Sequence, residues 1–221
     1  MKLNVIITGS TGMVGKGVLL ECIDSPDVES ILVINRSPVD VVHPKVKEII
    51  HKDFFDWSGI RDQLSGYNTS FFCMGVSSAG MKEADYRRMT YDLTLGFAKV
   101  VLFLNPTMTF CYVSGAGTDS SEKGRMMWAR VKGKTENDLL SLGFKAAYMF
   151  RPGYIHPMRG IKSKTRLYNT FYTFLKPLYG LLKRMPKYVT NNVTIGKAMI
   201  AVGLKGYSKG ILESIDINKI K

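Results

Sequence analysis

The sequence contains little cysteine and little histidine, and neither residue type is spaced as in a metal site. The three cysteines are odd in number and far apart in the 221 residues, and they form no Cys-x-x-Cys motif. They are Cys22, Cys73 and Cys111, and the equally isolated histidines are His43, His51 and His156. This pattern argues against a disulfide framework or a zinc site and favours a reducing compartment. We therefore predict a protein that binds no metal.

Long apolar runs are also missing. No stretch approaches the roughly 18 consecutive apolar residues that indicate a membrane-spanning helix. The apolar run within residues 1–9 is too short for the core of a secretory signal and is broken by turn residues. The sequence therefore predicts a cytoplasmic location.

Acidic residues are absent from one long segment. Residues 139–212 hold 13 Lys and Arg but no Asp or Glu, whereas residues 1–138 hold 16 of each sign and residues 213–221 hold two of each. The whole net charge of +13 therefore lies in one part of the chain. A basic segment of this kind suits phosphates, an anionic substrate, nucleic acid or a membrane surface.

Short β-branched runs alternate with helical patterns over the first 151 residues. The runs are almost continuously apolar, as strands buried on both faces are. Expected strands cover residues 2–8, 30–35, 46–51, 70–74, 109–114 and 146–151, and expected helices cover 13–23, 57–64, 82–104 and 124–142. This alternation predicts an α/β fold with a doubly wound parallel sheet, the Rossmann fold.

After residue 151 the alternation stops. Prolines and aromatic residues become frequent, and a last helix is expected over about 193–203, with Asn192 as its cap, before an apolar run at 211–217. We expect residues 152–221 to form a small basic cap, packed on the sheet on the substrate side. Because about 70 residues with this many prolines are poorly suited to folding alone, we predict one domain over residues 1–221.

The strongest motif is Gly9-Ser-Thr-Gly12-Met-Val-Gly15, directly after the first strand. One glycine permits the tight turn, one lets a pyrophosphate approach the backbone, and one allows close packing of helix and strand. The N–H groups at the start of the helix then face the anion. The motif predicts a dinucleotide site, although a purely structural glycine turn has the same sequence.

The end of the second strand indicates which dinucleotide is bound. NAD sites place a carboxylate there, whereas this chain has Asn35-Arg36-Ser37. A guanidinium can hold a 2′-phosphate in a fork and Ser37 can add a hydroxyl, so NADP is favoured over NAD. Alternatively, Arg36 is a solvated loop cation with no role in binding. Asp53 can accept from the adenine amine or cap a turn.

Taken in chain order, these motifs resemble those of the extended and atypical short-chain dehydrogenase/reductases. The segments that carry the resemblance are Gly9 to Gly15, Cys73-Met-Gly75, Tyr112-Val-Ser114, Lys132 and Arg151-Pro-Gly153. Within that superfamily, residues 131–136 and 186–190 are similar to NAD-dependent epimerase/dehydratase-type proteins related to the Tat-interacting oxidoreductase branch.

The resemblance implies a role for each matching residue. Gly75 would lie under the adenosine, Ser114 would orient a substrate carbonyl or hydroxyl, and Lys132 would bond the nicotinamide ribose. Pro152 and Gly153 would pass beside the nicotinamide, and Arg36 would hold the adenosine phosphate. The residues implied at the pyrophosphate are Gly9, Thr11, Gly12, Met13, Val14 and Gly15.

One departure from the family pattern concerns catalysis. The family has Tyr-x-x-x-Lys with tyrosine as proton donor, but four residues before Lys132 this chain has Trp128. An indole donates a hydrogen bond but does not exchange a proton as a phenol does. Other groups that could act as the acid are Tyr154, His156, Tyr112 and Cys73. Each also has a structural interpretation, in the packing of a loop or of the core.

Two further features keep alternatives open. Ser114 begins a Ser-Gly-Ala-Gly-Thr stretch that can equally be a simple turn, and the chain has no Gly-x-Ser-x-Gly elbow of a serine hydrolase. Residues 159–187, the basic segment, interleave cations with aromatics. This segment can be a solvated face, a lid for an anionic substrate, or a contact with a membrane surface or a protein. Nucleic acid is disfavoured because no recognised binding motif accompanies the charge.

Two functions follow from these observations. The first is an NADP(H)-binding oxidoreductase or epimerase-like enzyme that acts on a small carbonyl or hydroxyl substrate. The second is a non-catalytic NADP(H)-binding sensor or interaction module that presents the basic segment to a partner or a membrane, and Trp128 motivates it.

Overall fold

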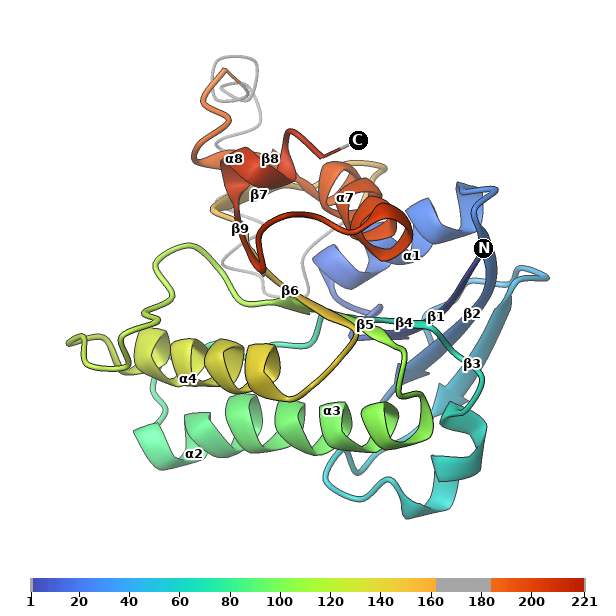
Figure 1. Ribbon diagram of the computed structural model, residues 1–221, viewed down its shortest axis with the longest axis horizontal. Coiled ribbons are helices and arrows are strands. Elements are labelled where there is room, and N and C mark those ends of the chain that lie inside the picture. Colours follow the sequence, from blue (N-terminus) through green and yellow to red (C-terminus); the bar gives the residue numbers. More distant parts are fainter. Residues whose placement is uncertain (1, 162–183, 221) are drawn as a thin grey trace.

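A parallel sheet of seven strands forms the centre of the computed structural model, which describes residues 2–161 and 184–220. Its order is β3-β2-β1-β4-β5-β6-β9 (Figure 1). The strands are β1 (Leu3–Thr8), β2 (Val28–Asn35), β3 (Val46–Ile50), β4 (Thr69–Phe72), β5 (Thr109–Val113), β6 (Ala146–Arg151) and β9 (Ile211–Glu213). The order reverses between β1 and β4, and such a switch point is where α/β sheets bind ligands.

Helices cover both faces of this sheet (Figure 1). One layer contains α1 (Met13–Asp24) and α7 (Asn192–Lys205), which pack against each other. The other contains α2 (Glu83–Arg87), α3 (Leu93–Leu104) and α4 (Met127–Ser141). Each layer encloses its own apolar core, and strand residues contribute to both cores. The predicted α/β fold with a doubly wound parallel sheet is confirmed.

Several details of the prediction were wrong. The six expected strands are one too few, because β9 pairs with β6 through Phe150 and Leu212. A second, two-stranded sheet joins β7 (Tyr154–His156) to β8 (Val189–Asn191). The residue that caps α7 is Asn191, whose side chain accepts a hydrogen bond from the Thr194 N–H, and not Asn192.

The helix expected over residues 82–104 is interrupted. Between α2 and α3 the chain makes one π-helical turn, η2 (Arg88–Asp92). Elsewhere a short 3₁₀ helix, η1 (Ser58–Leu64), replaces the helix expected over 57–64, and α8 (Ser214–Ile217) follows β9. π-helical turns are rare and occur frequently at functional sites.

Only part of the predicted cap belongs to the described residues. Residues 162–183, with the aromatic cluster and five of the cations, lie outside them. Of the rest, β9 joins the main sheet and α7 covers one of its faces, so these elements belong to the Rossmann layers themselves. Among the helices of the described residues, none has the length and apolar character that a membrane crossing requires.

Candidate functional site

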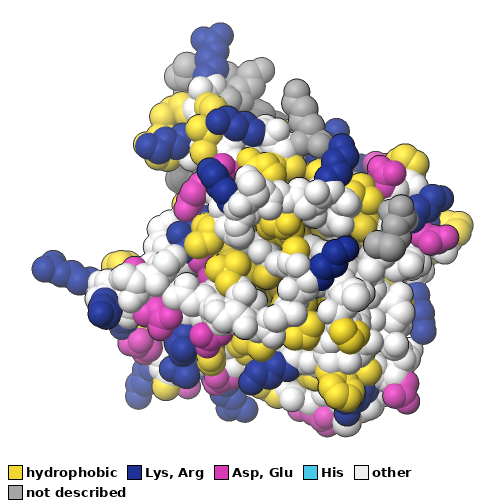
Figure 2. Space-filling view, in the orientation of Figure 1, with side chains coloured by type: hydrophobic (Ala, Val, Ile, Leu, Met, Phe, Trp, Pro, Cys, Tyr) yellow, Lys and Arg dark blue, Asp and Glu magenta, His cyan; other side chains and the backbone are white. Residues whose placement is uncertain are grey.

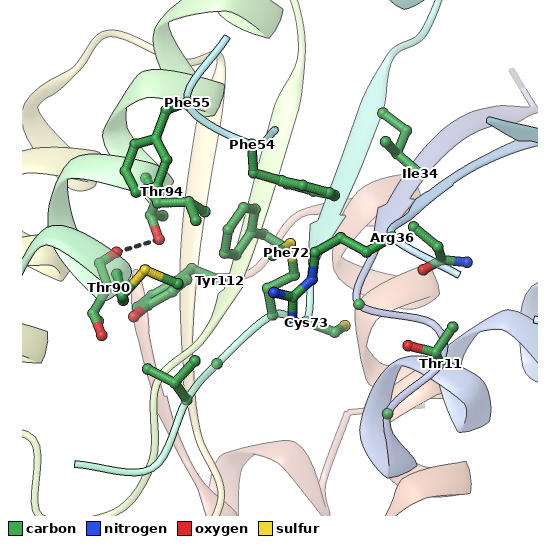
Figure 3. A pocket seen from close by; sticks show the side chains of 18 of the residues that line it. Thr11, Ile34, Arg36, Phe54, Phe55, Phe72, Cys73, Thr90, Thr94 and Tyr112 are labelled. Atoms are coloured by element: carbon green, nitrogen blue, oxygen red, sulfur yellow. Dashed lines mark hydrogen bonds between the residues drawn. The ribbon is translucent and has the colours of Figure 1, made fainter. Parts of the chain in front are cut away.

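A cleft of about 610 Å³ opens at the carboxyl end of the sheet, across its switch point (Figure 3). Its lining comes from the loops after β1, β2, β3 and β4, from β5, and from η2, α3 and α4. Nine of the residues predicted for a cofactor site lie in this lining. They are Gly9, Thr11, Gly12, Met13, Arg36, Ser37, Asp53, Gly75 and Lys132.

The glycine turn forms the centre of the cleft. Gly9 has φ +76°, and a Cβ there would lie 2.8 Å from the backbone of Cys73 and Met74. A side chain at residue 9 would therefore be strained in conformation and would collide with the loop after β4. Gly15 serves packing, because its Cβ would lie 2.4 Å from the Gly9 carbonyl oxygen. Gly15 and Val14 accordingly lie outside the cleft lining.

The start of α1 is open to an anion. Its N-cap is Gly12, which has no side chain to bond the first N–H groups, and its first turn carries no acidic residue. The unpaired N–H groups and the positive end of the helix dipole therefore meet the cleft at Met13. This is the arrangement that phosphate groups bind in other proteins.

A small hydrogen-bond network fixes the end of β2. The Asn35 amide donates to Ser10 Oγ at 2.9 Å and to Glu48 Oε1 at 2.8 Å. The next residue, Arg36, extends its side chain into the cleft (Figure 3). Within residues 2–161 and 184–220, Arg36 forms no ion pair. Its guanidinium thus remains able to bind an anionic ligand.

The loop after β3 adds the cation Lys52 and the carboxylate of Asp53 to the same end of the cleft. Asp53 Oδ1 accepts a hydrogen bond from the Phe55 N–H at 2.9 Å, so this carboxylate stabilises a turn, which is one of the two roles that the sequence left open. Among the described residues, three cations, Arg36, Lys52 and Lys132, line the cleft together with this single acid. The excess of positive charge suits a ligand that carries phosphates.

Lys132 enters the opposite end of the cleft from α4. Its Nζ donates a hydrogen bond to the backbone carbonyl oxygen of Ser114. Burial lowers the pKa of Lys132 to about 8, and the negative charge of Glu136, one helical turn later, partly opposes this shift. Lys132 thereby becomes a cleft residue that exchanges a proton near neutral pH.

An ion pair behind Lys132 holds this part of the site. Glu136 is completely buried and accepts hydrogen bonds from Nε and Nη2 of Arg151. The guanidinium also donates to Ser120 Oγ at 2.5 Å and lies 3.4 Å from the exposed carboxylate of Glu213. The pair joins α4 to β6, so it fixes the helix that carries Lys132.

Ser114 and Trp128 do not line the cleft. The Ser114 hydroxyl is buried and donates to the Phe150 carbonyl oxygen at 3.1 Å. The Trp128 indole packs over Gly117, where an added Cβ would lie 3.2 Å from Cη2 of the ring. Both predicted catalytic residues are thus neighbours of Lys132, through the Ser114 carbonyl and through α4, but their side chains do not belong to the cleft lining.

The residues that follow β6 also lie outside the lining. Gly153 N–H donates to Ser214 Oγ at 2.8 Å, and the Pro152 carbonyl accepts from the Ala116 N–H at 2.9 Å. On β7 the hydroxyl of Tyr154 is 3.4 Å from Nδ1 of His156. These contacts secure the second sheet beside the main one.

Two of the alternative acids do line the cleft; Tyr112 is buried, and Cys73 is half-buried. Burial raises the pKa of Cys73 to about 12 and raises the pKa of Tyr112 well above its usual value. An effective general acid has a pKa near the working pH. Neither side chain therefore suits proton donation at neutral pH as well as Lys132 does.

Several residues that line the cleft could not be predicted from the sequence. Phe54 and Phe55 come from the loop after β3, and Thr90 and Thr94 come from η2 and α3 (Figure 3). The two threonines lay within a pattern that predicted one uninterrupted helix. Hydrophobic periodicity marks which side of a helix is buried, but it does not show a π-helical turn.

Only the edges of the basic segment are described. Arg159 pairs with Glu21 at 3.0 Å and with Asp24 at 2.8 Å, while Arg184 and Lys187 are exposed. Figure 2 shows Lys and Arg together with apolar side chains on the part that projects at the top, beside the undescribed residues. A contact of this segment with a membrane surface or a protein stays a prediction.

Comparisons with other sequences identify relatives but no family. No model of a known protein family matches the chain. The protein FMP52, mitochondrial, of Debaryomyces hansenii is 29% identical over 153 residues, which cover 68% of this chain and 66% of that protein. Its namesake in Emericella nidulans is 28% identical over 211 residues, 91% of this chain and 88% of that protein. Because these relatives are named mitochondrial, the expected cytoplasmic location is contradicted.

Comparisons with solved structures concern the fold. Bordetella bronchiseptica WbmF in complex with NAD⁺ has a TM-score of 0.68 at 14% identity, covering 99% of this chain and 77% of its own. The UDP-N-acetylglucosamine 4-epimerase of Methanobrevibacter ruminantium M1 has a TM-score of 0.67 at 15% identity, covering 96% of this chain and 76% of its own. The Saccharomyces cerevisiae short-chain dehydrogenase/reductase YIR035C has a TM-score of 0.67 at 11% identity, covering 99% of each chain. The predicted resemblance to short-chain dehydrogenase/reductases is thus confirmed for the fold.

Proposed function

We propose that the cleft binds NADP(H) and that the protein is an NADP(H)-dependent oxidoreductase acting on a small carbonyl or hydroxyl compound. One observation carries this proposal: a glycine turn and an uncapped helix start share a cleft with Arg36, a cation in the place where NAD sites have a carboxylate. The fold of WbmF, which was solved with NAD⁺, supports a nicotinamide cofactor in general.

Different parts of the cleft would hold different parts of the cofactor. The glycine turn and the start of α1 would bind the pyrophosphate, and Arg36 with Ser37 would bind the 2′-phosphate. Lys132 would donate to the nicotinamide ribose. When bound, the cofactor supplies or accepts a hydride. The oxygen of the substrate then has to gain or lose a proton, and Lys132 Nζ is suited to hold that proton because of its position in the cleft and its lowered pKa.

The first test concerns Arg36. We expect Arg36→Ala to weaken NADPH binding by about 1.5–3 kcal/mol, the range for a hydrogen bond to a charged group, and to leave NADH binding almost unchanged. Calorimetric titration at one fixed salt concentration measures both affinities. Arg125→Ala, at an exposed arginine outside the cleft, is the matched control and should change neither affinity. Equal losses for the two cofactors in Arg36→Ala would contradict a role in reading the 2′-phosphate.

The second test concerns Lys132. Its ammonium attracts the anionic cofactor only while it is protonated, so NADPH affinity should fall as the pH rises through about 8. The 2′-phosphate titrates near pH 6, so measurements from pH 7 to 9 separate the two groups. Lys132→Met should bind more weakly and without this pH dependence. Lys134→Met, on the same helix outside the cleft, should keep it; a wild-type affinity that is flat over this range would contradict the assignment.

A second function is favoured by the surroundings of Ser114 and Trp128. The Ser114 hydroxyl is engaged with Phe150, and the indole lies over Gly117 outside the cleft lining. A non-catalytic module that senses NADP(H) and presents the basic segment would need neither residue in the cleft. A panel of aldehydes, ketones and quinones assayed with NADPH separates the two functions. Robust turnover excludes the sensor, whereas tight NADPH binding without any turnover excludes the oxidoreductase.

A further inference from the structure

Thr90 is a buried residue of the π-helical turn η2 that faces the cleft. Its side chain is 5% exposed, and its hydroxyl oxygen has no hydrogen-bond partner. It lies near Thr94 and Tyr112, at the end of the cleft away from Thr11 (Figure 3). Burial of a hydroxyl without a hydrogen-bond partner is energetically unfavourable, so the presence of Thr90 here calls for a physical reason.

Two other buried helical threonines behave differently. Thr94 Oγ1 donates to the carbonyl oxygen of Thr90 at 2.5 Å, and Thr135 Oγ1 donates to that of Val131 at 2.8 Å. Both bonds reach back four residues, which is the usual way for a helix to satisfy a threonine. Thr90 forms no such bond, so its bonding capacity remains available toward the cleft.

The phenol of Tyr86 is a neighbouring group that could satisfy the Thr90 hydroxyl in place of a ligand. Burial raises the pKa of Tyr86, and the nearby Thr90 side chain acts against this shift. The Thr90 and Tyr86 hydroxyls are not placed as a hydrogen bond requires, since the Thr90 hydroxyl oxygen has no hydrogen-bond partner. Proximity to Tyr86 therefore does not satisfy the Thr90 hydroxyl.

The order of the strands shows which part of a dinucleotide would meet Thr90. Arg36 follows β2, whereas the neighbouring Tyr112 belongs to β5, and β1 and β4 lie between those strands. Lys132, which enters from α4, also lines the cleft. If the 2′-phosphate lies at Arg36, the opposite nucleotide lies toward Thr90, and its ribose carries hydroxyl groups that can both donate and accept.

We propose that Thr90 is a positioning residue whose hydroxyl bonds the ribose on the nicotinamide side of NADP(H). This inference rests on the proposed function and adds to it a contact that the sequence did not reveal. The π-helical turn supplies the reason for the contact, because it leaves the hydroxyl unpaired within the helix and facing the ligand.

The test compares a whole cofactor with its adenosine half. Thr90→Val removes the hydroxyl at nearly constant volume and should weaken NADPH binding by about 3- to 10-fold, the value of one hydrogen bond. Binding of adenosine 2′,5′-bisphosphate, which lacks the nicotinamide nucleotide, should be unchanged. Thr90→Ser, which keeps the hydroxyl, should bind NADPH like the wild type. The melting temperature of ligand-free Thr90→Val should not fall, because the lost hydroxyl made no bond.

Each other result overturns the inference in an identifiable way. Unchanged NADPH binding in Thr90→Val means that water satisfies the hydroxyl. An equal loss for NADPH and the bisphosphate means that Thr90 supports the cleft as a whole. A Tyr86→Phe variant with the same loss assigns the effect to that phenol. If the wild type binds neither ligand, the proposed function fails and the inference fails with it.

Discussion

Replacement of Glu136 by alanine should lower the free energy of unfolding by about 3–5 kcal/mol, as the removal of one partner of a buried ion pair does elsewhere. Glu136 is fully buried, and the guanidinium of Arg151 makes a forked contact with it. Without the carboxylate, the partners of Arg151 among residues 2–161 and 184–220 are Ser120 and the more distant, exposed Glu213. The remaining, largely buried positive charge would then have little compensation.

Urea denaturation measures this effect, and two variants define its origin. Glu213→Gln removes the charge of the exposed partner of Arg151 but keeps an oxygen that can cap α8, and it should cost less than about 1 kcal/mol, as surface pairs do. A double change, Glu136→Leu with Arg151→Met, replaces the pair with apolar groups and should recover much of the lost stability. A loss of less than about 1 kcal/mol in Glu136→Ala would show that the pair does not hold α4 on the sheet.

Glu136→Ala should also shift the pH dependence of NADPH binding to lower pH, because Glu136 raises the pKa of Lys132.

Replacement of Trp128 by tyrosine should raise the rate of carbonyl reduction by about 10²–10⁴-fold, the usual contribution of a general acid. Residue 128 lies on α4, one helical turn before Lys132, so a phenol there would have an ammonium close by to lower its pKa. The indole of the natural residue cannot supply that proton. The rate is measured as NADPH oxidation over the panel of carbonyl compounds.

Trp128→Phe is the control for this gain. It opens the same space beside Gly117 as tyrosine does but adds no hydroxyl, so its rate should equal that of the wild type. Both variants lose contacts of the larger ring, and thermal melting shows whether they remain folded at the assay temperature. Equal rates in the tyrosine and phenylalanine variants would mean that the missing phenol is not what limits turnover.

The architecture could be predicted because its strands have an unambiguous pattern. Buried parallel strands such as β1 and β2 are continuous apolar runs that end in turn residues, and the helices between them fix the parallel order. The three-residue strands β7, β8 and β9 are too short to show any period. They exist because tertiary pairing satisfies their backbone groups, and one sequence does not display such pairing.

The site was predicted where a residue type is required by the backbone or by charge. Gly9 has to be glycine because of its positive φ and the close backbone of Cys73, and Arg36 stands where a carboxylate would otherwise be expected. Thr90 could not be found in this way, because a π-helical turn has no sequence pattern. Ser114 and Trp128 were placed by resemblance alone, and their side chains lie outside the cleft lining.

Calorimetric titration of the purified protein with NADPH and with NADH shows whether the cleft is an NADP(H) site. The salt concentration must be fixed, because the basic segment also attracts anions without specificity. We expect micromolar binding of NADPH that is clearly tighter than binding of NADH. If neither cofactor bound, the glycine turn, the open start of α1 and Arg36 would have no common ligand, and the proposed function would be wrong.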